Sequence, residues 1–390
     1  MTVTAIYADR ALTPLEEIAD PVIVVEDRRI AAIGHRDSIH VPRGAREIRA
    51  PGKIVVPGFV DVHIHGAGGH DVMEAYPDAL ETAARTAARF GTTSFVATTV
   101  TAALDRTCRS LEGIAQFIHA QTAPDQEIAA AEILGIHFEG PFISRARRGV
   151  HPDEWIVEPS IPSLRRMLSA AAGCAKILTL APELPGSLDL VDAARAEGLV
   201  VALGHTDATF EEAQAAIHRG ARHAVHVFNA MRPFSHRETG VLGAVLTSND
   251  VTTELIADGV HVDPAAMRLL LAAKGAARVV LVSDATSAAG MPDGVYRLGT
   301  FEVTVAGGVC RDIHGRLAGS TLTLDRALRN VIALGVPLAD AIRMLTLNPT
   351  TLLGLERTKG VLIPGADADL VLLSPDLHIA GVMTRGTGLH

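Results

Sequence analysis

The strongest constraint on the fold is a long alternation of short apolar runs with longer amphipathic segments. Eight runs read as strands, at residues 54–62, 94–99, 132–138, 176–180, 199–203, 223–228, 253–257 and 279–283. Helical periodicity fills the gaps between them, for example at residues 77–90, 104–120, 160–172, 210–219 and 264–274. Eight strands separated by helices are typical of an α/β fold, the (β/α)8 TIM-like barrel.

An open, doubly wound sheet is the alternative arrangement of alternating strands and helices. That fold binds dinucleotides through a Gly-x-Gly-x-x-Gly motif after its first strand. Residues 66–69 read Gly-Ala-Gly-Gly and do not match this motif, so we interpret them as a flexible loop. The barrel is therefore the predicted architecture.

Both ends of the chain carry strand patterns without helices between them. Short strands are predicted at residues 3–8, 22–26, 30–33 and 45–49, and again within 360–373 and 379–384. Because so few short strands bury little apolar surface alone, we expect both ends to meet in one β-sandwich. The predicted domains are a β-sandwich of residues 1–55 plus 355–390 and a barrel of residues 56–354.

Charge and cysteine content exclude several classes of partner. The net charge is −9 and no run of five basic residues occurs, which argues against nucleic acid and anionic membranes as partners. Cys108, Cys174 and Cys310 form no Cys-x-x-Cys pair, so we interpret them as structural residues. Without a secretory leader pattern or an apolar run of about 18 residues, a cytoplasmic protein is expected.

Imidazoles and carboxylates gather at the carboxyl ends of the predicted strands, where a barrel carries its active site. His63 and His65 are two positions apart at the end of the first strand, so their side chains point to the same face. Taken alone, the two residues would fit a pair of core histidines equally well. Four more such residues lie in or just after other strands: Glu139, His205, His226 and Asp284. This joint pattern predicts a metal site, because nitrogen and oxygen ligands suit several divalent ions.

These motifs resemble the amidohydrolase superfamily and, within it, the family of N-acetylglucosamine-6-phosphate deacetylases. His63-x-His65 and the Pro-Gly-Ala-Asp-Ala-Asp-Leu-Val stretch at residues 364–371 are signals of the superfamily. The more specific motifs are His-Phe-Glu-Gly-Pro-Phe at 137–142, Gly-His-Thr at 204–206, His-Val-Phe-Asn-Ala-Met at 226–231, Ala-Asp-Gly-Val-His at 257–261 and Ala-Gly-Ser at 318–320. The resemblance covers nearly the whole chain.

The resemblance implies the ligands of the metal. Glu139, His205 and His226 match the main ligands of the family, in a set suited to zinc or iron. Some members carry Gln-x-Asn in place of His63 and His65 and look built for one principal metal. Because this chain keeps both histidines, a second ion bridged by Glu139 is expected, which gives one or two divalent ions per chain, Zn²⁺ or Fe²⁺.

The resemblance also implies two catalytic residues. A metal lowers the pKa of its bound water to about 7, and Asp284 would accept the proton and deliver it to the departing amine. A helix cap or a turn carboxylate is the structural alternative for Asp284. His151 matches a family histidine that polarises the substrate carbonyl.

Four further positions match substrate contacts of the family: Asn229, Ala230, Arg237 and His261. Arg237 and His261 would contact the sugar phosphate, to which a guanidinium can bind with two hydrogen bonds. Arg237 would reach the site of a neighbouring subunit, so a homodimer is expected. Residues 286–320, with a hairpin-like segment at 296–305, would shape or cover the pocket.

Two histidines near the motifs need separate interpretations. His137 shares a strand face with Glu139, and the sequence leaves open whether it approaches the metal or packs inside the barrel. His223 lies three positions before His226 on a predicted strand, so its side chain should face away from the metal.

The predicted function is metal-dependent hydrolysis of the acetamide of N-acetylglucosamine-6-phosphate, a small phosphorylated amino sugar. An N-acetylgalactosamine-6-phosphate deacetylase would keep every residue named above. A hydrolase of cyclic amides of the dihydroorotase or hydantoinase type is disfavoured, because Lys176 lies at the wrong end of its strand to serve as a carboxylated bridge. A barrel without catalytic activity is disfavoured because the ligand set is complete.

Overall fold

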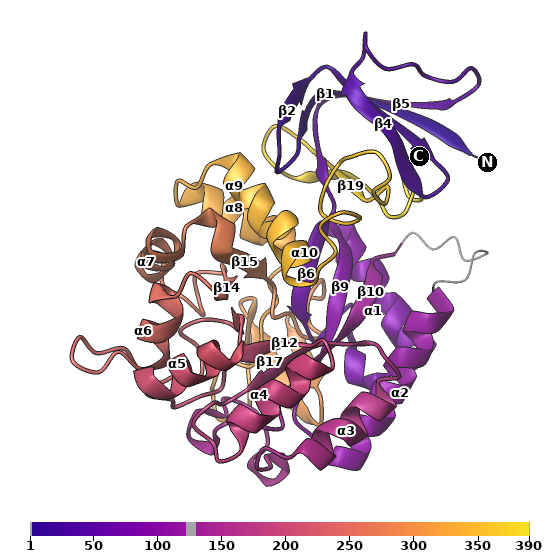
Figure 1. Cartoon of the computed structure of the whole chain (residues 1–390). Helices are drawn as coiled ribbons and strands as arrows, with labels where there is room; N and C mark the ends of the chain where they lie inside the picture. Colours follow the sequence, from indigo (N-terminus) through magenta and orange to yellow (C-terminus); the bar gives the residue numbers. More distant parts are fainter. Residues whose placement is uncertain (1, 122–129, 390) are drawn as a thin grey trace.

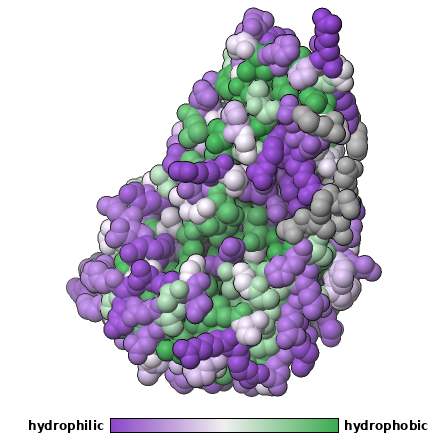
Figure 2. Space-filling model, turned by 45° about the vertical axis from the view of Figure 1, so that its right-hand side comes forward, coloured by the Kyte–Doolittle hydropathy of each residue, from purple (hydrophilic) through white to green (hydrophobic). Residues whose placement is uncertain are grey.

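The structure is a computed structural model that describes residues 2–121 and 130–389. Figure 1 shows a sheet formed by both chain ends above a larger barrel with helices around it. Hydrophobic residues lie across the middle of the face in Figure 2, between the narrow upper part and the broad lower part. Across the described ranges, no helix combines the length and apolar character that a membrane crossing requires.

The barrel is an eight-stranded parallel sheet whose strands follow one another in chain order. Its strands are β6 (Phe59–Ile64), β9 (Thr92–Thr99), β10 (Glu132–Glu139), β11 (Ala175–Leu180), β12 (Val200–Leu203), β13 (His223–Ala224), β14 (Thr252–Ile256) and β15 (Val279–Val282). The last strand, β15, packs against the first, β6, and a parallel bridge joins Ile64 to Ala285. The nearly closed sheet confirms the predicted (β/α)8 barrel.

Ten α-helices are present in the described ranges. They are α1 (Pro77–Arg89), α2 (Leu104–Gln121), α3 (Ile161–Ala170), α4 (Ser187–Ala196), α5 (Phe210–Arg219), α6 (Gly240–Thr247), α7 (Pro264–Lys274), α8 (Leu324–Ala333), α9 (Leu338–Leu345) and α10 (Leu347–Leu352). The ends of α5 show how local sequence sets helix bounds. Thr209 and Glu212 form a capping box at its start, and Gly220 ends it with a φ of 105° that suits glycine.

The strands from both chain ends form one seven-stranded sheet. Its strands are β1 (Val3–Leu12), β2 (Glu17–Ala19), β3 (Pro21–Glu26), β4 (Arg29–His35), β5 (Arg46–Pro57), β19 (Leu370–Leu373) and β20 (Ile379–Met383). The two ends meet where β19 pairs with β5 in antiparallel register. The division into domains at residues 55 and 355 stays a prediction.

The prediction of one strand over residues 54–62 is wrong. Residues 54–57 belong to β5 in the terminal sheet, whereas β6 of the barrel begins at Phe59. The chain passes between the sheets at Gly58, where an added Cβ would lie 2.0 Å from Thr93 Oγ1. The apolar run is continuous, but this close approach of the backbone to Thr93 divides it.

The predicted strand at 223–228 is also wrong in its extent, because β13 ends at Ala224. His226, Phe228 and Ala230 have φ angles of 29°, 81° and 50°, which break the extended conformation. His223 and His226 therefore do not share a strand. Strand alternation therefore does not set the relative direction of their side chains, contrary to the prediction.

Two small sheets lie beside the barrel. One pairs β7 (Gly66–Ala67) with β8 (His70–Asp71), and the other joins β16 (Gly294–Leu298), β17 (Phe301–Ala306) and β18 (Val309–Arg311). The second contains the predicted hairpin. Arg316, which follows it, donates to the carbonyl of Gly149 over 2.8 Å and so ties this segment to the loop that carries His151.

Candidate metal centre

Seven of the predicted site residues converge in one buried cluster at the carboxyl ends of the barrel strands. They are His63, His65, Glu139, His151, His205, His226 and Asp284. Three overlapping sets of three have their ligand atoms within 4.8 Å of one another. These sets are His63, His65 and Asp284; His63, Glu139 and His226; and Glu139, His151 and His205.

Glu139, the last residue of β10, forms the centre of the cluster. Its Oε1 lies 3.1 Å from His205 Nε2 and 3.0 Å from His226 Nε2. The two imidazole nitrogens are themselves only 3.1 Å apart. Three nitrogen and oxygen donors that face one another so closely match the donor set of a divalent metal ion.

The other half of the cluster is built on the strand β6 and the residue that follows it. His63 Nε2 lies 3.3 Å from Glu139 Oε1, and His65 Nε2 lies 3.5 Å from Glu139 Oε2. The Oδ1 atom of Asp284 is 3.6 Å from His63 Nε2 and 3.1 Å from His65 Nε2. Glu139 therefore faces both pairs of histidines, the position that a bridging carboxylate requires.

Hydrogen bonds on the outer side of the cluster aim the Nε2 atoms inward. His65 Nδ1 lies 3.1 Å from the carbonyl oxygen of Thr98, and His205 Nδ1 lies 3.1 Å from that of Arg147. Because a carbonyl only accepts, the proton of each ring is on Nδ1. In the neutral ring the lone pair is then on Nε2, the atom that faces the cluster and would bind a metal.

Burial lowers the pKa of His63 and His65, but the neighbouring carboxylates outweigh it and raise the pKa of both rings, whereas His205 and Glu139 are in the forms that bind a metal. Burial lowers the pKa of His205 to about 4, so this imidazole is neutral at pH 7, as a ligand must be. Burial raises the pKa of Glu139, but the surrounding imidazoles, His63 foremost, outweigh it and hold the pKa well below its ordinary value. His63 Nε2 is buried and has no hydrogen-bond partner among the described residues. The residues present therefore fit a divalent cation.

Asp284 follows β15 and has a φ of 49°. Its backbone amide donates to the carbonyl of His63 over 2.9 Å, which holds the carboxylate over the cluster. Burial raises the pKa of Asp284, but the hydrogen bond from His65 and the nearby imidazoles outweigh it, so the pKa is lowered. Asp284 is therefore an ionised carboxylate that can accept a proton.

His151 reaches the cluster from a loop. Its Nδ1 accepts from the backbone amide of Thr101 over 3.2 Å and lies 2.8 Å from the hydroxyl of the same residue. The proton of the neutral ring is then on Nε2, which lies 3.5 Å from Glu139 Oε2. This tautomer makes His151 a hydrogen-bond donor toward the cavity.

A cavity of about 190 Å³ opens onto the cluster. Asn229, Ala230 and His261 line it together with every histidine of the cluster except His63, and Leu298 of β16 forms part of its wall. Arg237 does not line it, because this residue lies on an exposed turn between Ser235 and Glu238. The structure thus brings every predicted site residue except Arg237 to one place.

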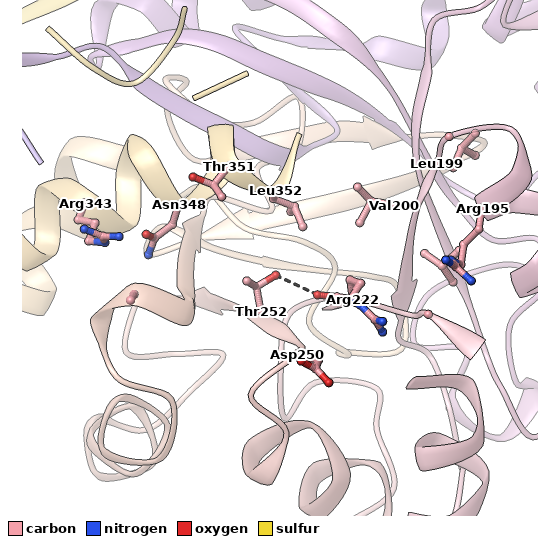
Figure 3. A pocket seen from close by; sticks show the side chains of 14 residues that line it. Arg195, Leu199, Val200, Arg222, Asp250, Thr252, Arg343, Asn348, Thr351 and Leu352 are labelled. Atoms are coloured by element: carbon pink, nitrogen blue, oxygen red, sulfur yellow. Dashed lines mark hydrogen bonds between the residues drawn. The ribbon is translucent and has the colours of Figure 1, made fainter. Parts of the chain in front are cut away.

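A larger cavity of about 530 Å³ lies where β12, β13 and β14 begin (Figure 3), whereas the cluster lies where the strands end. No predicted site residue lines it. Two of its arginines, Arg195 and Arg222, donate to the carbonyls of Arg219 and Ile217 at the end of α5. These guanidiniums cap a helix, as cations at a helix C-terminus commonly do.

The structure shows the surroundings of His137 and His223, the two histidines near the sequence motifs. His137 Nε2 lies 2.7 Å from the hydroxyl of Thr179, and burial lowers the pKa of His137 to about 3. His137 is therefore a packed, neutral residue of the barrel interior. His223 is buried and lies 3.0 Å from the carboxylate of Glu254.

Glu254 lies against the cluster, although the sequence did not predict it as part of the site. It is fully buried on β14 and accepts hydrogen bonds from the rings of His63 and His223. The signal was present, because Glu254 is the one charged residue within the apolar run 253–257. A carboxylate that points into a barrel is removed from water, so it requires hydrogen-bond donors or cations beside it.

Comparison with known proteins identifies the family of the chain. Residues 54–388 match the amidohydrolase family, so the chain is an amidohydrolase, a hydrolytic enzyme. An N-acetylgalactosamine-6-phosphate deacetylase of Escherichia coli O157:H7 is 39% identical over 97% of each chain. An N-acetylglucosamine-6-phosphate deacetylase of Bacillus subtilis (strain 168) is 35% identical over 96% of this chain and 94% of its own.

A solved structure of a deacetylase is also similar to this chain. A mutant of the N-acetyl-D-glucosamine-6-phosphate deacetylase from Mycobacterium smegmatis, in complex with N-acetyl-D-glucosamine-6-phosphate, is 36% identical with a TM-score of 0.91. The alignment covers 100% of both chains. The present chain belongs, within the amidohydrolases, to the family of N-acetylglucosamine-6-phosphate deacetylases, in which the metabolism of amino sugars is the shared role.

Proposed function

We propose that the protein hydrolyses the acetamide of N-acetylglucosamine-6-phosphate to acetate and glucosamine-6-phosphate. The observation that carries the proposal is the placement of Glu139 between two pairs of histidines, with the carboxylate of Asp284 beside them. Relatives with this activity in their names are similar over nearly their whole length.

Glu139, His205 and His226 would hold the principal metal ion, and His63 and His65 would hold a second. The donor set suits Zn²⁺ or Fe²⁺. A divalent ion bound there would lower the pKa of a water ligand to about 7 and polarise the amide carbonyl.

Asp284 and His151 would supply the proton transfer and the polar contact. The ionised carboxylate of Asp284 can take a proton from the attacking water and return it to the departing amine. The Nε2–H of His151 faces the cavity and can donate to the oxygen of the acetyl group as negative charge develops on it.

The phosphate would be bound by His261 and by Arg237 of the neighbouring subunit. His261 Nδ1 lies 2.7 Å from Asp258 Oδ2. Burial lowers the pKa of His261, but this carboxylate outweighs it and raises the pKa, which favours a cation for a phosphate to meet. The exposed position of Arg237 supports a contact across a homodimer, with Asn229 and Ala230 placed near the sugar.

Metal removal is the direct test. After chelation we expect acetate release from N-acetylglucosamine-6-phosphate to stop, and to return with Zn²⁺ or Fe²⁺. Metal content per chain, measured together with this release, separates a site with one ion from a site with two. Release that continues without metal would contradict the proposal.

N-acetylgalactosamine-6-phosphate is the second candidate substrate. The relative named for that activity is 39% identical, compared with 35% for the glucosamine relative of Bacillus subtilis. Both epimers carry the same acetamide and phosphate, so the metal cluster does not distinguish them. The ratio of kcat/KM for the two epimers decides which is the substrate.

Mixed dimers test the role of Arg237. We expect Arg237→Ala to raise KM for the phosphorylated sugar far more than for N-acetylglucosamine, because a guanidinium can donate two parallel hydrogen bonds to a phosphate. A dimer of one Arg237→Ala subunit and one Asp284→Asn subunit contains one site with both intact residues if Arg237 crosses the interface. Activity at low substrate should then exceed that of either homodimer. A mixed dimer no better than Arg237→Ala alone would place Arg237 in its own subunit's site.

A further inference from the structure

Glu254 contacts both halves of the candidate metal centre although it is not one of the clustered ligands. Its side chain is completely buried inside the barrel on β14. Oε2 lies 2.9 Å from His63 Nδ1 and also accepts from the backbone amide of His226 over 2.9 Å. Oε1 lies 3.0 Å from His223 Nε2. One carboxylate thus holds the ring of one candidate ligand and the backbone of another.

The hydrogen bonds fix the proton on His63. An ionised carboxylate accepts only, so His63 Nδ1 must carry the proton in the 2.9 Å contact. In the neutral ring the lone pair is therefore on Nε2, the atom that faces Glu139 and Asp284 and has no hydrogen-bond partner among the described residues. Without an acceptor at Nδ1, His63 would be free to rotate or to place its proton on Nε2, where it would block a metal.

His223 completes the arrangement on the side away from the cluster. Its Nε2 faces Glu254, and its Nδ1 lies 2.7 Å from the hydroxyl of Thr252 at the start of β14. A buried carboxylate is strongly unfavourable unless it is fully hydrogen-bonded, and the interiors of TIM barrels are otherwise filled by branched apolar residues. His223 supplies the third hydrogen bond that keeps Glu254 in place beneath His63.

We propose that Glu254 is a positioning residue for the metal centre, which sets the tautomer and the direction of His63 and anchors the turn that carries His226. The inference rests on the proposed function of the cluster as a metal site. Outer partners of metal-binding histidines typically contribute about 10–100-fold to metal affinity.

Two variants of Glu254 separate hydrogen bonding from simple packing. Glu254→Leu keeps a similar volume but removes the acceptor, so we expect the metal bound through His63 and His65 to bind about 10–100-fold more weakly. Glu254→Gln can turn its amide oxygen toward His63 and His226 and its amide nitrogen toward His223. We expect Glu254→Gln to restore most of the affinity. The readouts are metal content and chelator competition with Zn²⁺ on purified protein.

Two controls show whether the effect passes through His63. Glu132→Leu removes a largely buried carboxylate at the opposite end of β10 from Glu139, so it should lower the melting temperature without weakening metal binding. In a His63→Ala background, Glu254→Leu should cause little further loss at the site that His63 and His65 form.

The outcomes distinguish the two proposals. If the wild-type protein binds no divalent metal, the proposed metal centre fails. If the wild type binds metal and Glu254→Leu binds it with unchanged stoichiometry and affinity, the metal centre stands and the role of Glu254 is overturned. Equal losses for Glu254→Leu and Glu254→Gln, or equal losses with and without His63, would also overturn it.

Discussion

Replacing Asp284 by Asn is expected to lower turnover by at least about 10²-fold, the usual contribution of a positioned acid or base. Asp284 Oδ1 lies 3.1 Å from His65 Nε2, and the lowered pKa keeps this carboxylate ionised at neutral pH. Asparagine has nearly the same shape and keeps an oxygen at that place. It cannot take up the proton that the reaction must move.

The measurement is kcat for acetate release together with metal content per chain. Metal content near that of the wild type is expected, because the four histidines and Glu139 remain. Asp20→Asn is a suitable control, since Asp20 is a surface carboxylate of the terminal sheet that pairs with Arg36 rather than with a histidine of the cluster. Unchanged turnover would remove Asp284 from the mechanism, and loss of metal would identify Asp284 as a ligand.

Replacing Lys359 by Met is expected to destabilise the protein by roughly 3–5 kcal/mol, the usual result when one partner of a buried ion network is removed. Lys359 is 5% exposed, and its Nζ lies 2.8 Å from Asp367 and 2.7 Å from Asp369. Glu132 at the start of β10 contacts the same Nζ. Without the ammonium, three carboxylates would face one another between the barrel and the terminal sheet.

Urea unfolding followed by circular dichroism measures this loss. Arg219→Met is the control, because Arg219 pairs with Asp192 on the surface, where solvent screens an ion pair and it contributes little to stability. A loss for Lys359→Met no larger than that for Arg219→Met would contradict a cohesive role for the network. Asp369 also accepts a hydrogen bond from the backbone amide of Arg385, so the network around Lys359 includes the last strands of the chain.

The sequence determined the barrel and most residues of the candidate metal centre. Alternation of apolar strands and amphipathic helices depends on neighbouring residues, so it can be recognised without a structure. The carboxyl ends of barrel strands lie on one rim, so His63, His65, Glu139, His205, His226 and Asp284 could be expected to converge. The family resemblance added His151, Asn229, Ala230, Arg237 and His261, none of which the strand pattern alone would indicate.

Only the tertiary structure decided how the side chains of different strands meet. The division of the run 54–62 at Gly58 depends on Thr93, a residue of the next strand. The turn at His226 is anchored by Glu254, which is 28 positions away in the chain. The proton on His63 is placed by the same carboxylate from 191 positions away. Tautomer and side-chain direction depend on hydrogen-bond partners that only long-range packing brings together, so no local pattern of residues contains them.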